Sequence, residues 1–129
     1  MLLQVGAELE PTHFGHYKYL HLAVTDLPEQ DIIRIFPAAF RFIDDAIAGG
    51  GAVLVHCQAG VSRSATVVIG YCMWKEKLSV DAAVARVMAA RSVVWPNPGF
   101  KCQLQQFEAL KWDASKWNGW SSEKYLSLQ

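Results

Sequence analysis

Apolar residues follow two periodicities that alternate along the chain. Residues 2–5 and 17–24 are rich in strand-forming residues, and the second segment alternates in the manner of a half-buried strand. Residues 52–56 form a nearly continuous apolar run directly after the glycines at 49–51, which is typical of a fully buried strand. The sequence therefore predicts a strand in each of the three segments.

Helical spacing of apolar residues dominates the rest of the chain. The first such segment begins after Asp31, which is placed to cap it, and contains Pro37, where we expect a bend. Its apolar positions are Ile32, Phe36, Ala39, Phe40, Ile43 and Ile47. Three further helices are predicted over residues 64–77, over residues 80–90 with Ser79 as the N-cap, and over residues 100–112.

Strands that alternate with helices predict a layered α/β fold, with a central, mostly parallel sheet of about four strands flanked by helices. A length of 129 residues fits one domain. We assign residues 1–113 to that domain and residues 114–129 to a polar C-terminal tail that carries Trp117 and Trp120.

The charge balance excludes several classes of partner. Twelve basic and twelve acidic residues cancel, and the basic residues do not cluster, so no broad field attracts nucleic acid or a membrane surface. No apolar run is long enough to span a membrane. The three cysteines show no metal-ligand spacing and fit a reducing compartment. We therefore expect a cytoplasmic or nuclear protein.

The most informative segment joins the strand predicted over residues 52–56 to the following helix. It reads His56-Cys57-Gln58-Ala59-Gly60-Val61-Ser62-Arg63-Ser64. In such a turn, backbone N–H groups converge on one point and the helix N-terminus adds partial positive charge, which together form an anion site. Gly60 gives the turn conformational freedom, and the planar guanidinium of Arg63 can hold two phosphate oxygens. The phosphate-binding loop is predicted to contain Gln58, Ala59, Gly60, Val61, Ser62 and Arg63.

Cys57 lies where this loop would stabilise negative charge. Such surroundings lower a thiol pKa from about 8.5 to between about 3.5 and 7.5, so that the group is a thiolate at neutral pH. A thiolate that attacks phosphorus in line forms a phosphocysteine intermediate. We expect Ser64 to donate a hydrogen bond to the departing sulfur and His56 to support the shape of the loop.

A phosphate ester of serine, threonine or tyrosine also needs a proton on its leaving oxygen. Asp26 is the candidate acid, because it follows the strand at 17–24 and parallel strands bring such loops to the edge that holds Cys57. Glu29 and Asp31 are rivals, although Asp31 is better placed to cap a helix.

Read as His-Cys-x-Ala-Gly-x-Ser-Arg-Ser, residues 56–64 resemble the signature of the dual-specificity phosphatases, a branch of the protein tyrosine phosphatase superfamily. The resemblance covers roughly residues 2–110: Asp26 falls 31 residues before the cysteine, where this family places its general acid, and residues 96–104 resemble the entry to its last helix. It implies a tyrosine-phosphatase-like fold, a catalytic domain over residues 1–113, a phosphoprotein substrate phosphorylated on tyrosine, serine or threonine, and no metal or other cofactor.

Alternatives stay open. Family members usually carry a strand and a helix before the segment that begins here at Leu2, so we expect an uncovered sheet edge and self-association through it. The same loop could hold a phosphoprotein without turnover, act on a phosphate ester that is not a protein, or serve sulfur transfer. The intact Cys57 argues against the first. Gln58 and Val61, neither of them basic, argue against polyanionic substrates, and Ser64 argues against sulfur transfer.

Overall fold

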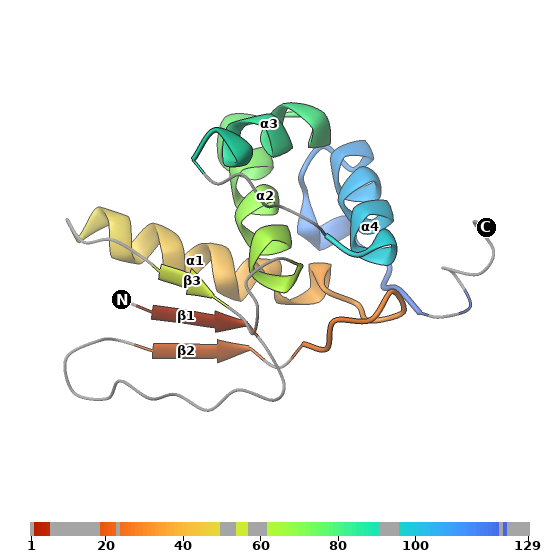
Figure 1. Cartoon of the computed structure of the whole chain (residues 1–129), viewed down its shortest axis with the longest axis horizontal. Coiled ribbons are helices and arrows are strands. Elements are labelled where there is room, and N and C mark those ends of the chain that lie inside the picture. The colour runs from red at the N-terminus through yellow and green to blue at the C-terminus, as the bar shows by residue number, and fades with distance from the viewer. Residues whose placement is uncertain are drawn as a thin grey trace.

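A parallel sheet of three strands forms one layer of the computed structural model (Figure 1). The structure describes residues 2–5, 19–22, 24–49, 54–56, 62–90, 96–121 and 123. The central strand β1 (Leu2–Val5) lies between β2 (Tyr19–Leu22) and β3 (Leu54–His56), and both pairings are parallel. Each strand falls within a predicted segment, and the expected total of about four strands stays a prediction.

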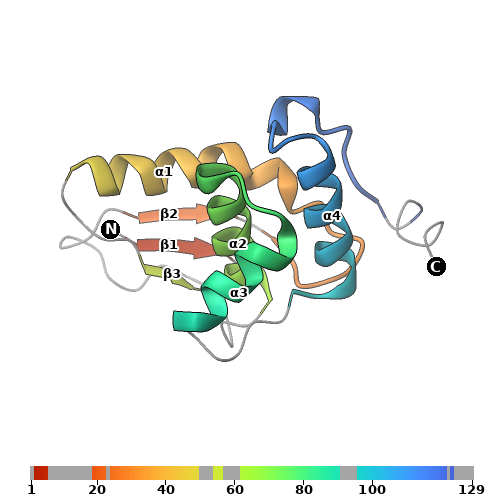
Figure 2. The same cartoon turned by 90° about the horizontal axis from the view of Figure 1, so that it is seen from above.

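Helices form the second layer within the described residues. They are η1 (Ile33–Ile35, 3₁₀), α1 (Phe36–Ala48), α2 (Arg63–Glu76), α3 (Val80–Ala90), α4 (Pro98–Ala109) and η2 (Ala114–Lys116, 3₁₀). Figure 2 shows α1 running alongside the strands while α2 crosses over them. Helix α1 contacts β1 and β2, helix α2 contacts β1 and β3, and α3 and α4 pack against α2. This layering of helices on a parallel sheet agrees with the predicted α/β class.

The first predicted helix is divided into two parts. The 3₁₀ turn Ile33–Ile35 leads directly into α1 at Phe36, so Pro37 lies in the first turn of the α-helix. A proline at that position lacks only an N–H group that the helix would not use, and its fixed φ suits the helix start. The predicted bend at Pro37 stays a prediction, and the structure shows a change of helix type at Phe36, directly before the proline.

Aromatic side chains join α1, α2 and α4. The ring centroids of Phe36 and Phe40 lie 4.8 Å apart, and Phe36 meets Phe107 edge-on at 5.3 Å. Phe40 also stacks on Trp74 of α2 at 5.2 Å. Phe36 and Phe107 are completely buried, which stabilises the fold by roughly 2–3 kcal/mol for each ring. The cluster fixes α2, whose first residues belong to the predicted phosphate-binding loop.

Gly70 lies on α2 at a point where the Phe36 ring leaves no room for a side chain. A β-carbon at position 70 would lie 2.4 Å from the ring. We expect Gly70→Ala to lower the free energy of unfolding by about 1–2 kcal/mol, because overpacking costs about 1–3 kcal/mol and alanine recovers up to about 1 kcal/mol of helix propensity. Urea denaturation measures the difference. The same substitution in a Phe36→Leu background should cost clearly less, and an equal cost in both backgrounds would contradict this explanation.

Helix α4 is shifted relative to its prediction over residues 100–112. The side chain of Asn97 caps it by accepting the N–H of Phe100 at 2.9 Å, so the helix already begins at Pro98. It ends at Ala109, because the chain then enters the left-handed region, where Trp112 has a φ of 61°. The shift places Asn97 at a helix start, with its amide nitrogen available to another segment.

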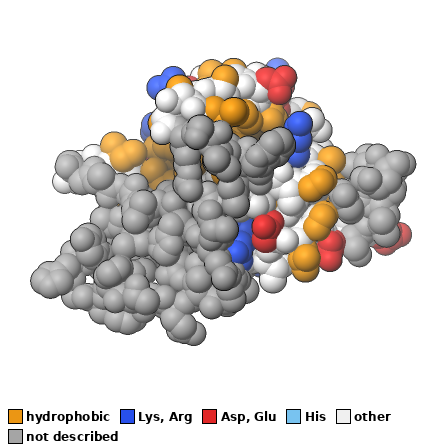
Figure 3. Space-filling model, in the orientation of Figure 1, with side chains coloured by type: hydrophobic (Ala, Val, Ile, Leu, Met, Phe, Trp, Pro, Cys, Tyr) orange, Lys and Arg blue, Asp and Glu red, His pale blue; other side chains and the backbone are white. Residues whose placement is uncertain are grey.

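Basic and acidic side chains are interspersed over the described part of the face in Figure 3. This distribution agrees with the balance of twelve basic and twelve acidic residues in the chain. Among the described residues, none of the helices combines the length and the apolar character that crossing a membrane requires.

Candidate active site

The carboxyl ends of β2 and β3 lie at the same edge of the sheet (Figure 1). Because the strands are parallel, the chain leaves Leu22 in the direction of Asp26, and leaves His56 in the direction of Cys57, at that edge. Adjacent strands are about 4.8 Å apart, so the two strand ends, with β1 between them, are separated by about 10 Å. The two segments that carry Asp26 and Cys57 therefore leave the sheet close enough together to contact one small ligand.

Part of the predicted phosphate-binding loop lies outside the described residues. These positions are Cys57, Gln58, Ala59, Gly60 and Val61. Their roles stay predictions. The structure describes both ends of the segment: the backbone of His56 closes β3, and Ser62, Arg63 and Ser64 begin α2.

The start of α2 is buried and held by its own hydrogen bonds. Ser62, Arg63 and Ser64 are 6%, 5% and 2% exposed. The carbonyl oxygen of Ser62 accepts the N–H of Thr66 at 2.9 Å and the hydroxyl of the same residue at 2.6 Å. A helix of 14 residues directs its first N–H groups and partial positive charge towards the segment before it. This geometry suits an anion bound just before Ser62.

Arg63 is tied to the strand end that leads to Asp26. Its Nη1 donates a hydrogen bond to the carbonyl oxygen of Val24 at 3.2 Å, and both residues are buried. The bond connects α2 with the segment after β2 and fixes the guanidinium at this edge of the sheet. A planar guanidinium oriented in this way can offer a pair of N–H groups to two oxygens of an anion.

Asp26 lies exposed at the same edge. Its Oδ1 accepts a hydrogen bond from Nδ2 of Asn97 at 2.9 Å. The backbone N–H of Asn97 in turn donates to Oγ of Ser62 at 3.0 Å. Asn97 therefore connects the loop that carries the candidate acid to the residue directly before Arg63, so that three segments distant in sequence meet here.

The role of Asn97 was missed by reasoning from the sequence, although the residue belongs to the segment 96–104 noted for its resemblance. One signal was available, because an asparagine before a proline at a helix start is a common N-cap pattern. The second contact could not be inferred locally, because Asp26 and Asn97 are 71 positions apart.

Gln103 fixes the end of the Asp26 loop. Its buried side chain donates from Nε2 to the carbonyl oxygen of Gln30 at 2.8 Å and accepts the N–H of Ile32 at 2.9 Å. The side chain of Gln30 accepts the hydroxyl of Thr25 at 2.8 Å, which closes the loop on itself. The segment that carries the candidate acid is thus a defined turn supported from α4.

The two rival acids have other surroundings. Glu29 is exposed on the same loop. The Oδ1 of Asp31 accepts the N–H of Arg34 at 3.2 Å and the indole N–H of Trp117 at 3.0 Å, although the N-cap of η1 is Ile32 and not Asp31 as predicted. Its Oδ2 accepts the backbone N–H of Trp120 at 3.1 Å. The carboxylate of Asp31 therefore has a structural task, whereas Asp26 and Glu29 are both exposed, and the acid role of Asp26 stays a prediction.

The other two cysteines lie in helices, as predicted. Cys72 is half-buried against the core. Burial, reinforced by the nearby Glu76, raises the pKa of the Cys72 thiol, so this group stays protonated at neutral pH. The pKa of the Cys72 thiol is therefore shifted in the opposite direction to the one predicted for Cys57.

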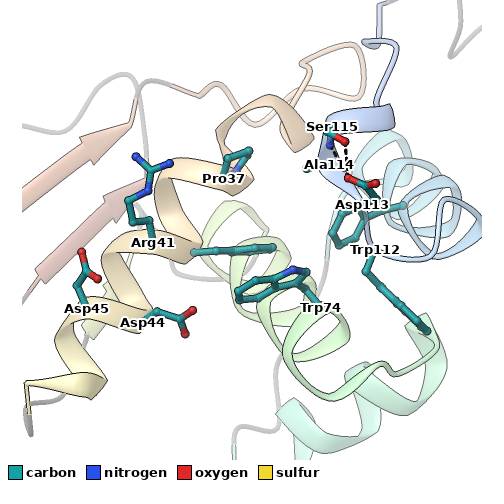
Figure 4. Close-up of a pocket in the computed structure, with 11 residues that line it drawn as sticks. Pro37, Arg41, Asp44, Asp45, Trp74, Trp112, Asp113, Ala114 and Ser115 are labelled. Atoms are coloured by element: carbon teal, nitrogen blue, oxygen red, sulfur yellow. Dashed lines mark hydrogen bonds between the residues drawn. The ribbon is translucent and has the colours of Figure 1, made fainter.

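A cavity of about 530 Å³ lies at the other end of α2 (Figure 4). Aromatic side chains of Phe40, Trp74, Phe107 and Trp112 line it, together with Asp44, Asp45 and Asp113. Trp74 follows Arg63 by eleven positions, which corresponds to about 16 Å along a helix. No cysteine or histidine belongs to its lining, so this cavity is separate from the catalytic segments.

Comparison with known proteins places the whole region in a family context. Residues 2–110 match the family model described as "Dual specificity phosphatase, catalytic domain". The chain is 39% identical over 110 residues to dual specificity protein phosphatase 19 of Mus musculus, covering 85% of this chain and 50% of that protein. It is 44% identical over 109 residues to human dual specificity protein phosphatase 1, covering 84% of this chain and 29% of the relative. The chain thus spans half or less of the length of these relatives.

Solved structures give the same result. The crystal structure of human tyrosine phosphatase-like serine/threonine/tyrosine-interacting protein superposes with a TM-score of 0.82 and 37% identity, covering 87% of this chain and 78% of the other. Human DUSP28 gives a TM-score of 0.81 and 32% identity, covering 87% and 76%. The tyrosine-phosphatase-like α/β fold implied by the sequence is therefore confirmed.

Proposed function

Because this chain belongs to the dual specificity phosphatase family, we propose that it hydrolyses phosphotyrosine and phosphoserine or phosphothreonine in proteins through a phosphocysteine intermediate. The observation that carries the proposal is the meeting of the buried Arg63, the start of α2 and the Asp26 loop at one edge of the sheet. A phosphate ester bound at this edge has an anion site on one side and a carboxyl group on the other.

In the first step, the thiolate of Cys57 attacks phosphorus and forms a sulfur–phosphorus bond while the bond to the leaving oxygen breaks. Asp26 gives its proton to that oxygen, so the alcohol or phenol departs neutral. In the second step, water attacks the phosphocysteine and gives a proton to the carboxylate of Asp26. The sulfur leaves as a thiolate, assisted by the hydroxyl of Ser64, and inorganic phosphate is released.

The transferred phosphoryl group keeps its negative charge through both steps. Two N–H groups of Arg63 and the backbone N–H groups of residues 58–62 would hold its oxygens, and His56 would support the loop that carries them. The bond from Nη1 of Arg63 to Val24 at 3.2 Å supports this role, because it orients the guanidinium before substrate binds. Neither Gln58 nor Val61 is basic, which favours a substrate with a single phosphate.

The partner that follows from this chemistry is a phosphoprotein, without a metal or other cofactor. Self-association through the N-terminal sheet edge, the division of the chain at residue 113, and a location in the cytoplasm or nucleus stay predictions.

Esters that differ in their leaving groups can test whether Asp26 is the general acid. Asp26→Asn should lower kcat/KM on phenyl phosphate by about a hundredfold, because kcat/KM reports the step in which the leaving group departs and a poor leaving group needs the proton there. On para-nitrophenyl phosphate, whose leaving group is stable as an anion, the loss should be much smaller. Glu29→Gln is the matched control, since it removes an exposed carboxylate from the same loop. Equal losses on both esters would show that Asp26 is not the acid, and a wild-type chain inactive on both would refute the proposed function.

A further inference from the structure

The C-terminal segment after α4 folds back on the loop that carries Asp26. Figure 1 shows this segment, in blue, reaching the orange loop between β2 and α1. The indole N–H of Trp120 donates to the carbonyl oxygen of Pro28 at 2.8 Å, and Trp120 is only 8% exposed. Pro28 follows Asp26 by two positions, with only Leu27 between them, so the contact lies close to the candidate acid in the chain.

The same segment also forms hydrogen bonds with Asp31 at the end of the loop. The carboxylate of Asp31 accepts the indole N–H of Trp117 at 3.0 Å and the backbone N–H of Trp120 at 3.1 Å. Gly119 between the two tryptophans has a φ of 91°, a conformation that favours glycine and lets the chain turn so that both reach Asp31. Hydrogen bonds to a charged acceptor are stronger than those between neutral groups. The two bonds to the Asp31 carboxylate therefore hold the C-terminal segment on the loop.

Pro28 is held from its other side by the start of α4. A β-carbon placed on Gly99 would lie 1.9 Å from the carbonyl oxygen of Pro28, so the two backbones are in direct contact. The loop is therefore enclosed between α4 and the segment 117–120. Asp26 itself stays exposed and is oriented by Asn97, which also belongs to the α4 side.

We propose that Trp120 is a positioning residue for the general acid: it presses the loop at Pro28 against α4 and so keeps the carboxyl group of Asp26 facing the bound phosphate ester. This inference rests on the proposed role of Asp26. Without the indole hydrogen bond, the loop moves away from Gly99 more often, and the proton is then delivered in a smaller fraction of encounters. Loss of Trp120 therefore slows the protonation of the leaving group, while binding of the phosphate by Arg63 is unchanged.

The test compares Trp120→Phe with Trp112→Phe. Both variants remove one indole hydrogen bond to a backbone carbonyl, of 2.8 Å to Pro28 and of 2.9 Å to Leu78, but only the first touches the Asp26 loop. We expect Trp120→Phe to lower kcat/KM on phenyl phosphate by about fivefold, as for a hydrogen bond of ordinary strength, and on para-nitrophenyl phosphate by less than about twofold. Trp112→Phe should leave the ratio of the two rates at the wild-type value.

A second readout does not depend on turnover. The N–H of Gln30 donates to the carbonyl oxygen of Leu27 within the loop at 3.0 Å, and its hydrogen exchange should become about fivefold faster in Trp120→Phe but not in Trp112→Phe. Unchanged exchange in Trp120→Phe, or equal losses on both esters, would overturn the inference. A wild-type chain without turnover would instead refute the proposed function, and the exchange rates would still decide whether Trp120 holds the loop.

Discussion

Exchange of Cys57 for serine is expected to lower kcat on para-nitrophenyl phosphate by at least about ten thousandfold. The N–H groups of the loop and the start of α2 can keep a thiol ionised at neutral pH, because its pKa is low enough to be shifted below 7. A serine hydroxyl in the same surroundings stays protonated and is a weak nucleophile. Serine has nearly the same shape as cysteine, so the variant should fold and bind phosphate. Steady-state phosphate release measures the effect.

Cys72→Ser is the matched control for this experiment. It replaces sulfur by oxygen in the same way, but at a residue of α2. Burial raises the pKa of the Cys72 thiol, so this thiol is not a nucleophile at neutral pH. Its kcat should stay within about twofold of the wild-type value, since surface and half-buried exchanges of this size have small effects. Turnover that survives in Cys57→Ser, or disappears equally in both variants, would contradict the assignment of the nucleophile.

Helix starts that depend on nearby side chains could be predicted from the sequence. Ser79 is an example: its hydroxyl accepts the N–H of Ala82 at 3.1 Å, and α3 begins at Val80, as expected of an N-cap. The strands could be predicted for a similar reason, because short apolar segments between turns have few alternatives. In each of these cases the deciding contacts lie within a few residues of the pattern.

The errors occur where contacts between distant residues decide the backbone. Apolar spacing predicted that the last helix continues to Trp112, but the chain leaves the helix after Ala109. The indole of Trp112 instead donates to the carbonyl oxygen of Leu78, a residue 34 positions earlier. An apolar pattern reports that a side chain is buried, and does not report the backbone conformation that buries it.

The candidate site divides in the same way. Residues 56–64 are contiguous, so their chemistry could be read from the sequence, and the parallel sheet order made Asp26 a reasonable acid. Two contacts that hold the Asp26 loop in place join residues 71 and 92 positions apart, Asn97 with Asp26 and Trp120 with Pro28. Such pairs become visible only once α4 and the C-terminal segment are placed around the loop.

Arg63→Lys is expected to lower kcat/KM on aryl phosphates by about a thousandfold, although the positive charge is kept. A guanidinium offers two parallel N–H groups to two phosphate oxygens, whereas an ammonium is a point charge on a flexible stem. Each hydrogen bond to a charged group contributes about 1.5–3 kcal/mol, so weakening two of them accounts for a loss of this size. The lysine also loses the planar group that Nη1 anchors to Val24 at 3.2 Å, which orients the side chain before substrate arrives.

The control for this substitution is Arg86→Lys. Arg86 pairs with Glu76 at 2.8 Å on an exposed surface of α3, where a lysine can keep most of the weak attraction between the two charges. Its kcat/KM should stay within about twofold of the wild-type value, while Arg63→Lys should lose both substrate affinity and turnover. A value for Arg63→Lys close to that of the control would mean that charge alone binds the phosphate, and the bidentate role of Arg63 would have to be abandoned.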